Sequence, residues 1–238
     1  MGPGRVRSET DFEGPRAAEG STVEAVYKLL KNDIIAGVRP AKELLRIDKM
    51  RKIYGVGPTP LRETLQRLTA EGLVIAREGR GFQVAPLAVD EFEDLNVART
   101  EIELAALRLS IEHGAESWEA EVVGATYMLE KADAQLAGSA SEAIDRWEAA
   151  NAKFHTALLA ACPSRWLLHT RSNFTVKCER YRRAVMVTDH RQRNSQLAKE
   201  HGDLSDAVLA RDAETACRLL REHYARTVRN FRDHAARK

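Results

Sequence analysis

The segment YGVGPTPLRETLQRL, from Tyr54 to Leu68, constrains the fold more than any other part of the chain. Gly55 and Gly57 allow the chain to reverse within a few residues, because glycine readily takes positive φ angles. Proline is well tolerated in the first turn of a helix, where a missing N–H costs little. The segment therefore predicts a tight turn followed at once by a new helix, which we expect Thr59 to cap.

The segments on either side of this turn predict a small folded module. The elements that we expect are a helix from Ser21 to Gly37, helices over Ile47–Tyr54 and Thr59–Glu71, and strands over Leu73–Arg77 and Phe82–Ala85. The helices follow from apolar residues at helical spacing. A short connection that contains glycine between two β-rich runs indicates a hairpin. Three helices followed by a hairpin have the order of a winged helix-turn-helix.

Five side chains of this module are candidates for DNA contacts. Thr59 and Arg62 lie in the first turn of the third helix, from which recognition helices contact base edges in the major groove. Arg80 lies at the tip of the hairpin, within reach of a DNA backbone or a minor groove. Arg67 and Arg77 complete the candidate set. The alternative is that the turn is only a turn and that Arg62 is a solvated charge.

The distribution of charge separates this module from the rest of the chain. The net charge of the 238 residues is only +2. Residues 21–85 carry 12 Lys and Arg against 7 Asp and Glu, whereas residues 86–238 carry 22 against 24. A basic module joined to a slightly acidic one indicates that only the first meets a polyanion such as double-stranded DNA.

The rest of the chain has a helical pattern throughout. The expected helices cover Asp90–His113, Ser117–Leu136, Ser141–Ala161, Arg165–Val187, Gln192–Ala210 and Asp212–His234. Breaks fall mainly at glycine and proline, as expected for helix ends. We therefore predict a mainly α protein with three parts: a flexible tail over 1–20, a winged helix-turn-helix with a β-hairpin wing over 21–85, and an all-α six-helix bundle over 86–238.

Composition indicates where such a protein works. No apolar run approaches the roughly 18–20 residues that span a membrane. The N-terminus lacks the pattern of a secretory signal. The three cysteines are scattered and form no CxxC pair, which favours reduced thiols. We expect a cytoplasmic protein that does not enter a membrane.

Three histidines of the helical domain suggest a metal site. His155, His201 and His223 each lie on an apolar face of a different predicted helix. Such faces meet inside a bundle, where metal sites are commonly built. Imidazoles suit zinc, nickel or a similar divalent ion, and three of them leave coordination positions open for water or a ligand. The alternative for each histidine is an ordinary hydrogen-bonded core side chain.

Arg99 is a candidate for binding a small acid. It shares a predicted helix face with Leu95 and Ile102, so its guanidinium is expected to point into the bundle. A buried charge needs a partner, and two parallel N–H donors of arginine match the oxygens of a carboxylate. That carboxylate belongs either to an effector or to a glutamate of the chain itself. Arg180 and Tyr181 are further pocket candidates.

The first module resembles a known family. VYKLLKNDIIAGVRP, LRIDKMRKIYGVGPTPLRETLQRLTAEGLV and GRGFQV are similar to the DNA-binding domain of GntR-family bacterial repressors. The resemblance covers about 65 residues and implies binding of operator DNA. Family members commonly have Ser-Arg before the Thr-Pro pair, and that arginine reads the operator. This chain has Gly57-Pro58 instead, which leaves its operator sequence open.

The helical half resembles the FCD ligand-binding domain of the FadR-type branch of that family, through RTEIELAAL, KFH and KEHGDLSDAVLARDAETACRLLREHY. Such domains often bind a divalent metal through Asp-x-x-x-His on one helix and a histidine on each of two later helices. Carried over, the ligands are Asn151, His155, His201 and His223, with asparagine in place of the usual aspartate. The resemblance also implies a small organic acid as effector, held by Arg99 near the metal.

The expected function is that of a homodimeric, ligand-responsive repressor. Two recognition helices would meet the half-sites of a palindromic operator, and the effector would shift the balance between two arrangements of the domains. GVGPTPLRE and FHTALLAAC are similar to carbon-starvation regulators that sense dicarboxylates such as glutarate. Two alternatives remain at this point: a metal-dependent enzyme acting on a small carboxylate, although no motif such as HExxH places a general base, and a metal-free regulator that binds an acyl-coenzyme A.

Overall fold

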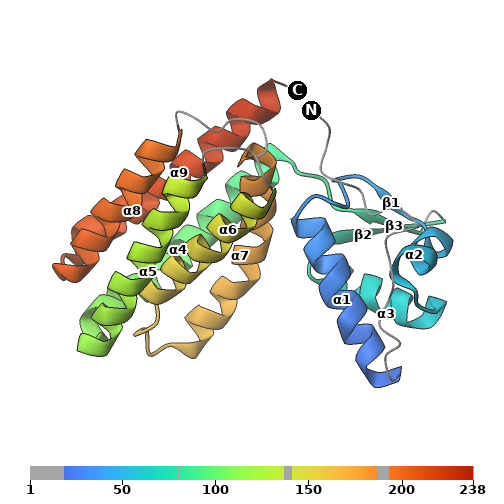
Figure 1. Cartoon of the computed structure of the whole chain (residues 1–238), viewed down its shortest axis with the longest axis horizontal. Helices are drawn as coiled ribbons and strands as arrows, with labels where there is room; N and C mark the ends of the chain where they lie inside the picture. The colour runs from blue at the N-terminus through green and yellow to red at the C-terminus, as the bar shows by residue number, and fades with distance from the viewer. Residues whose placement is uncertain (1–18, 80, 137–140, 187–192, 238) are drawn as a thin grey trace. The chain divides into compact units, whose positions relative to one another are not determined.

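The computed structural model describes residues 19–79, 81–136, 141–186 and 193–237 (Figure 1). The chain divides into two compact units, with the division between Leu87 and Ala88. Residues 1–18 of the tail predicted over 1–20, and Arg80 at the hairpin tip, lie outside the described residues. The last two positions of that predicted tail, Glu19 and Gly20, instead belong to the first helix. No helix among the described segments is long and apolar enough to cross a membrane.

The first unit combines three helices with a small sheet. Its elements are α1 (Glu19–Ile35), β1 (Leu44–Leu45), α2 (Ile47–Tyr54), α3 (Pro58–Ala70), β2 (Val74–Arg77) and β3 (Gly81–Val84). The sheet is antiparallel throughout, with the order β1-β3-β2. Leu30 of α1, Met50 of α2 and Leu65 of α3 are fully buried, so the three helices share one core. The two-residue strand β1 was not predicted, because two residues carry no recognisable alternation.

The turn between α2 and α3 corrects two details of the sequence interpretation. Gly55 ends α2 in the left-handed region, with φ 64° and its N–H bonded to the carbonyl of Arg51. Gly57 instead has φ −69° and ψ 168°, an extended conformation open to any residue. It is the N-cap of α3, which begins at Pro58 and has no side-chain cap. Thr59 therefore does not cap the helix, since the N-cap lies two residues earlier and Pro58 takes the first helical position.

The second unit is all-helical, which confirms the predicted fold class. Its helices are α4 (Val89–His113), α5 (Glu116–Gln135), α6 (Ser141–Leu158), α7 (Arg165–Met186), α8 (Arg193–Leu209) and α9 (Ala213–Ala236). Helix α4 packs on α7 and α9, while α5 packs on α6 and α8, and α8 packs on α9. The core side chains between them include Leu104, Leu129, Phe154, Leu204 and Leu220, each at most 1% exposed. The faces of α6, α8 and α9 that turn inward carry the three histidines singled out above.

Candidate metal and ligand site

The structure brings the three histidines of the helical unit together. His155 on α6, His201 on α8 and His223 on α9 each offer one nitrogen, and these atoms all lie within 4.8 Å of one another. The side chains are 3%, 1% and 7% exposed. Their ring centroids are 5.1–6.0 Å apart. Three imidazoles at this spacing form a donor set that fits a divalent metal ion.

In His155 and His223, hydrogen bonds determine which ring nitrogen carries the proton. Nδ1 of His223 is 2.9 Å from Oε2 of Glu200, a carboxylate oxygen that only accepts. Nδ1 of His155 is 3.2 Å from the hydroxyl of Tyr224. That hydroxyl donates its single proton to Glu103 at 2.5 Å, so it accepts from His155. In both rings the proton is on Nδ1, and the lone pair of Nε2 is available to bind a metal.

Burial keeps these rings neutral in the metal-free protein. Loss of solvation lowers the pKa of His155 well below the ordinary value, and the nearby His223 and Arg99 add to the effect. Burial also lowers the pKa of His223 to about 4, although the hydrogen bond with Glu200 opposes the shift. A metal competes with protons for imidazole nitrogens. At neutral pH these two rings are already in the form that binds metal.

Asn151 lies one helical turn before His155 on α6 and is 3% exposed. Its Oδ1 is buried and has no hydrogen-bond partner within the described segments, and neither nitrogen of His201 has one. Buried polar atoms are nearly always hydrogen-bonded in native proteins, and binding of an ion is one explanation for exceptions. The unpartnered atoms of Asn151 and His201 therefore belong with the candidate metal site.

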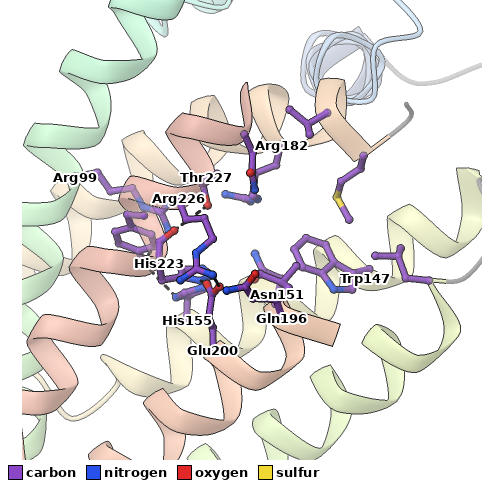
Figure 2. A pocket seen from close by; sticks show the side chains of 16 residues that line it. Arg99, Trp147, Asn151, His155, Arg182, Gln196, Glu200, His223, Arg226 and Thr227 are labelled. Atoms are coloured by element: carbon purple, nitrogen blue, oxygen red, sulfur yellow. Dashed lines mark hydrogen bonds and ion pairs between the residues drawn. The ribbon is translucent and has the colours of Figure 1, made fainter. Parts of the chain in front are cut away.

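A cavity of about 320 Å³ opens beside the histidines (Figure 2). Its lining comes from helices α4, α6, α7, α8 and α9 and from the end of α5, and consists of Arg99, Leu136, Trp147, Asn151, His155, Arg182, Val185, Met186, Gln196, Leu197, Glu200, His223, Tyr224, Arg226, Thr227 and Asn230. His201 is not part of the lining. Most of the lining side chains carry polar or charged groups, which favours a small polar ligand in this cavity.

Arg99 lines the cavity, but it is already paired inside the protein. Its Nε donates to Glu103 at 2.7 Å, and Nη2 donates to the hydroxyl of Tyr224 at 2.9 Å. The guanidinium also stacks over the Tyr224 ring, 3.9 Å from the centroid. From the sequence, the partner of Arg99 was either an effector carboxylate or a glutamate of the chain itself. The structure shows the glutamate, Glu103. Arg99 and Glu103 thus form a buried charge pair beside the cavity.

Two arginines that the sequence analysis missed also line the cavity. Arg182 on α7 donates to both carboxylate oxygens of Glu148, at 2.8 and 3.2 Å. Arg226 on α9 places Nη1 2.6 Å from Oε1 of Glu200. Its Nε is buried and has no hydrogen-bond partner in the described part of the chain. The sequence signal was present for Arg226, which lies three residues after His223 and so shares its helix face.

The other two pocket candidates, Arg180 and Tyr181, are absent from the cavity lining. Tyr181 donates to Glu91 at 3.1 Å, and its ring stacks on Phe92 with centroids 4.2 Å apart. The reason is helical periodicity: Arg182 faces the cavity, and residues one or two positions earlier are rotated by 100–200° around the helix axis.

The DNA-contact candidates differ in how free their side chains are. Thr59 and Arg62 are exposed on α3. Arg67, in contrast, donates to Glu24 at 2.8 Å and stacks 3.5 Å from the ring centroid of Tyr27. Its contacts with α1 explain its conformation without DNA.

On the wing, Arg77 donates to Gln83 across the β2–β3 pair at 2.9 Å. Gln66 shares the exposed face of Thr59 and Arg62, at i+7 and i+4, and was not singled out from the sequence. Arg80 lies outside the described residues.

The chain matches two family models, one in each of its units. Residues 22–84 match the model of bacterial regulatory proteins of the gntR family, and residues 94–226 match the FCD domain. The chain belongs to the GntR family. It is 36% identical over 214 residues to BphR of Paraburkholderia xenovorans (strain LB400), named an uncharacterized HTH-type transcriptional regulator, covering 90% of this chain and 86% of that protein.

A second relative is the HTH-type transcriptional repressor GlaR of Escherichia coli (strain K12). It is 35% identical over 202 residues, which cover 83% of this chain and 90% of GlaR. Among solved structures, E. coli McbR/YncC has the same fold, with a TM-score of 0.74 at 19% identity over 90% of this chain and 98% of that one. The protein is therefore a GntR-family transcriptional regulator with an FCD domain. The enzyme alternative is excluded, because these relatives are regulators.

Proposed function

We propose that this GntR-family regulator is a repressor whose affinity for operator DNA is controlled by a small carboxylate bound beside a divalent metal in the FCD unit. The observation that carries the proposal is the cluster of three buried imidazoles, two of which, His155 and His223, line a cavity with many polar side chains. The protein would act in the cytoplasm as a homodimer on a palindromic operator, because paired recognition helices match paired half-sites.

The residues around the cluster fit a metal ion. His155, His201 and His223 would hold it through their imidazole nitrogens, with the buried amide oxygen of Asn151 as a fourth donor. A set dominated by imidazole suits zinc or nickel better than calcium or magnesium, which prefer oxygen ligands. The bound ion would supply a positive charge and an open position for an effector oxygen.

Arg226 is the protein group that we expect to meet the effector carboxylate. Its buried Nε–H lacks an acceptor within the described residues, and arginine binds carboxylates through paired N–H donors. Gln196, Thr227 and Asn230 add polar groups to the lining. A cavity of about 320 Å³ is at the small end of ligand-binding pockets and suits a small organic acid rather than an acyl-coenzyme A.

Control of DNA binding requires two arrangements of the dimer with different affinities for the effector. A ligand shifts an equilibrium only by its differential affinity for the two states. An effector in the cavity would contact side chains of α7, α8 and α9, which line it, so a change in the packing of these helices would carry the signal. We propose that effector binding lowers operator affinity, as in an inducible repressor.

The test begins with the full-length protein. Its metal content is measured by elemental analysis, and thermal unfolding is followed with small mono- and dicarboxylates. A ligand present at 100 times its dissociation constant stabilises the folded protein by about 2.7 kcal/mol.

An operator selected from random duplexes is then titrated with protein, with and without the stabilising acid. Stabilisation that requires metal, together with weaker operator binding, supports the proposal. Operator binding that no metal or acid changes would contradict it.

A further inference from the structure

Each imidazole of the metal site is faced from outside by an oxygen of another side chain. Nδ1 of His223 meets Glu200 at 2.9 Å, and Nδ1 of His155 meets Tyr224 at 3.2 Å. Nδ1 of His201 faces Oδ2 of Asp133 at 3.5 Å. Because Nδ1 faces an oxygen in all three rings, Nε2 is the nitrogen of each ring that is available for a metal.

Glu200 is fixed from two sides. Glu200 precedes His201 on α8, but its side chain contacts two residues of α9. Oε2 accepts from His223, while Oε1 lies 2.6 Å from Nη1 of Arg226. A carboxylate between an imidazole and a guanidinium cannot rotate without losing one of them. Glu200 therefore holds His223 in one orientation and one tautomer (Figure 2).

Asp133 has the matching position for His201. It is 6% exposed at the end of α5, and its Oδ1 accepts the indole N–H of Trp147 at 2.7 Å. The second oxygen, Oδ2, and Nδ1 of His201 are both buried and have no hydrogen-bond partner in the described segments. They face each other at 3.5 Å, slightly beyond a good hydrogen bond. A small inward shift of His201 or Asp133 would satisfy both atoms at once.

Glu200 and Asp133 bring negative charge close to a set of neutral metal ligands. The four proposed donors, three imidazoles and the amide of Asn151, carry no negative charge. A carboxylate that accepts from one nitrogen of an imidazole makes the other nitrogen a stronger metal ligand. We propose that Glu200 and Asp133 are positioning residues of the metal site, which fix the Nδ1–H tautomers of His223 and His201 and supply the negative charge that Asn151 lacks. This inference rests on the proposed metal binding.

Zinc affinity of the full-length protein tests the inference directly. Zn²⁺ is titrated in competition with a chromophoric chelator into the parent, Glu200→Gln and Asp133→Asn. An amide can turn its NH₂ group toward the imidazole and favour the wrong tautomer, so we expect about 10- to 100-fold weaker binding in each variant. Glu148→Gln is the matched control, because it removes a buried carboxylate that pairs with Arg182 rather than with an imidazole. Its zinc affinity should equal that of the parent.

Nuclear magnetic resonance of the metal-free protein gives a second measurement. If Glu200 and Asp133 only stabilised the fold, replacing them would not change which ring nitrogen of the histidines carries the proton. With ¹⁵N-labelled histidine, the ring nitrogens report which atom carries the proton. We expect Nδ1–H for His223 and His201 in the parent, and a loss of this preference for His223 in Glu200→Gln. A proton on Nε2 of His223 in the parent would overturn the inference even before metal is added.

Asn151→Asp tests the charge argument. This variant brings a negative charge to the centre, so Glu200→Gln should weaken zinc binding less in the Asn151→Asp background than in the parent, by the logic of a double-mutant cycle. Equal zinc affinity in the parent and in Glu200→Gln would overturn the inference and leave the proposed metal site standing. A parent that binds no zinc would overturn both.

Discussion

The three imidazoles of the FCD unit are the residues on which the proposed function depends most. Each is buried, and each comes from a different helix. In a metal-free core, such side chains would be expected to find hydrogen-bond partners for both nitrogens. His201 finds none for either nitrogen within the described residues. This combination favours the proposed metal site over an ordinary group of core histidines.

Replacing His201 with alanine should remove the metal. Two imidazoles and an amide remain, and we expect zinc affinity to fall at least 100-fold, because one of the strong donors is lost. Elemental analysis after gel filtration measures the bound metal. The control is His169→Ala, which changes an exposed histidine on α7. Equal metal content in His201→Ala and in the control would rule out the shared site.

At the scale of elements, the turn between α2 and α3 determines how the recognition helix is presented. Gly55 takes a positive φ of 64°, whereas Gly57 has φ −69°. The two glycines therefore tolerate substitution differently. A Cβ added at Gly57 would lie 3.8 Å from its nearest neighbour, Cδ of Pro60, which is an ordinary contact.

Gly55→Ala should destabilise the first unit, while Gly57→Ala should be nearly neutral. An alanine in the left-handed region costs roughly 1–2 kcal/mol, and none of this strain arises at φ −69°. Urea unfolding followed by circular dichroism measures both variants against the parent. The pair serves as its own control, and similar losses of stability in both would contradict the assigned turn geometry.

Helix α3 is the element that we expect to read the operator. Arg62 is exposed in its N-terminal half, on the face shared with Thr59 and Gln66. Arg62→Ala should weaken operator binding by about 1–3 kcal/mol, or roughly 5- to 150-fold, if it contacts bases. Fluorescence anisotropy with the selected operator measures this at physiological salt.

The effector and metal affinities of Arg62→Ala should remain unchanged, because the cavity and the histidines lie in the other unit. Arg218→Ala, an exposed substitution on α9, is the matched control for removing one positive charge. Operator affinity of Arg62→Ala equal to that of this control would show that α3 reads DNA through other side chains.

On the scale of the whole molecule, the candidate ligand site and the DNA-contact candidates lie in different units. The histidines of the candidate metal site and the residues that line the cavity all belong to the unit that begins at Ala88. The DNA-contact candidates belong to the unit that ends at Leu87. Each has its own buried core. Regulation therefore requires that the state of one unit changes the DNA affinity of the other.

The separated helical unit should keep its metal site. A fragment of residues 88–238 is expected to be helical and to bind Zn²⁺ within about threefold of the full chain, because every proposed ligand lies within it. Circular dichroism and chelator competition measure the two properties. The same fragment should not bind the operator. Zinc binding that is lost in a folded fragment would show that the first unit completes the site.

The sequence by itself determined the elements and their order. Helical and strand periodicities are local, and glycine and proline mark the breaks, so the mainly α fold was predicted with helix ends close to those observed. The apolar faces that carry His155, His201 and His223 were also readable, because side chains three and four apart share a helix face.

Only the tertiary structure decided which groups meet. The contact of Glu200 with His223 and that of Asp133 with His201 join different helices, and no spacing within one helix encodes such a contact. Likewise, Arg99, Arg182 and Arg226 come from three different helices, and only the packing of these helices places them around one cavity. Local pattern fixes the direction of a side chain on its own helix, whereas the packing of the helices selects its partner.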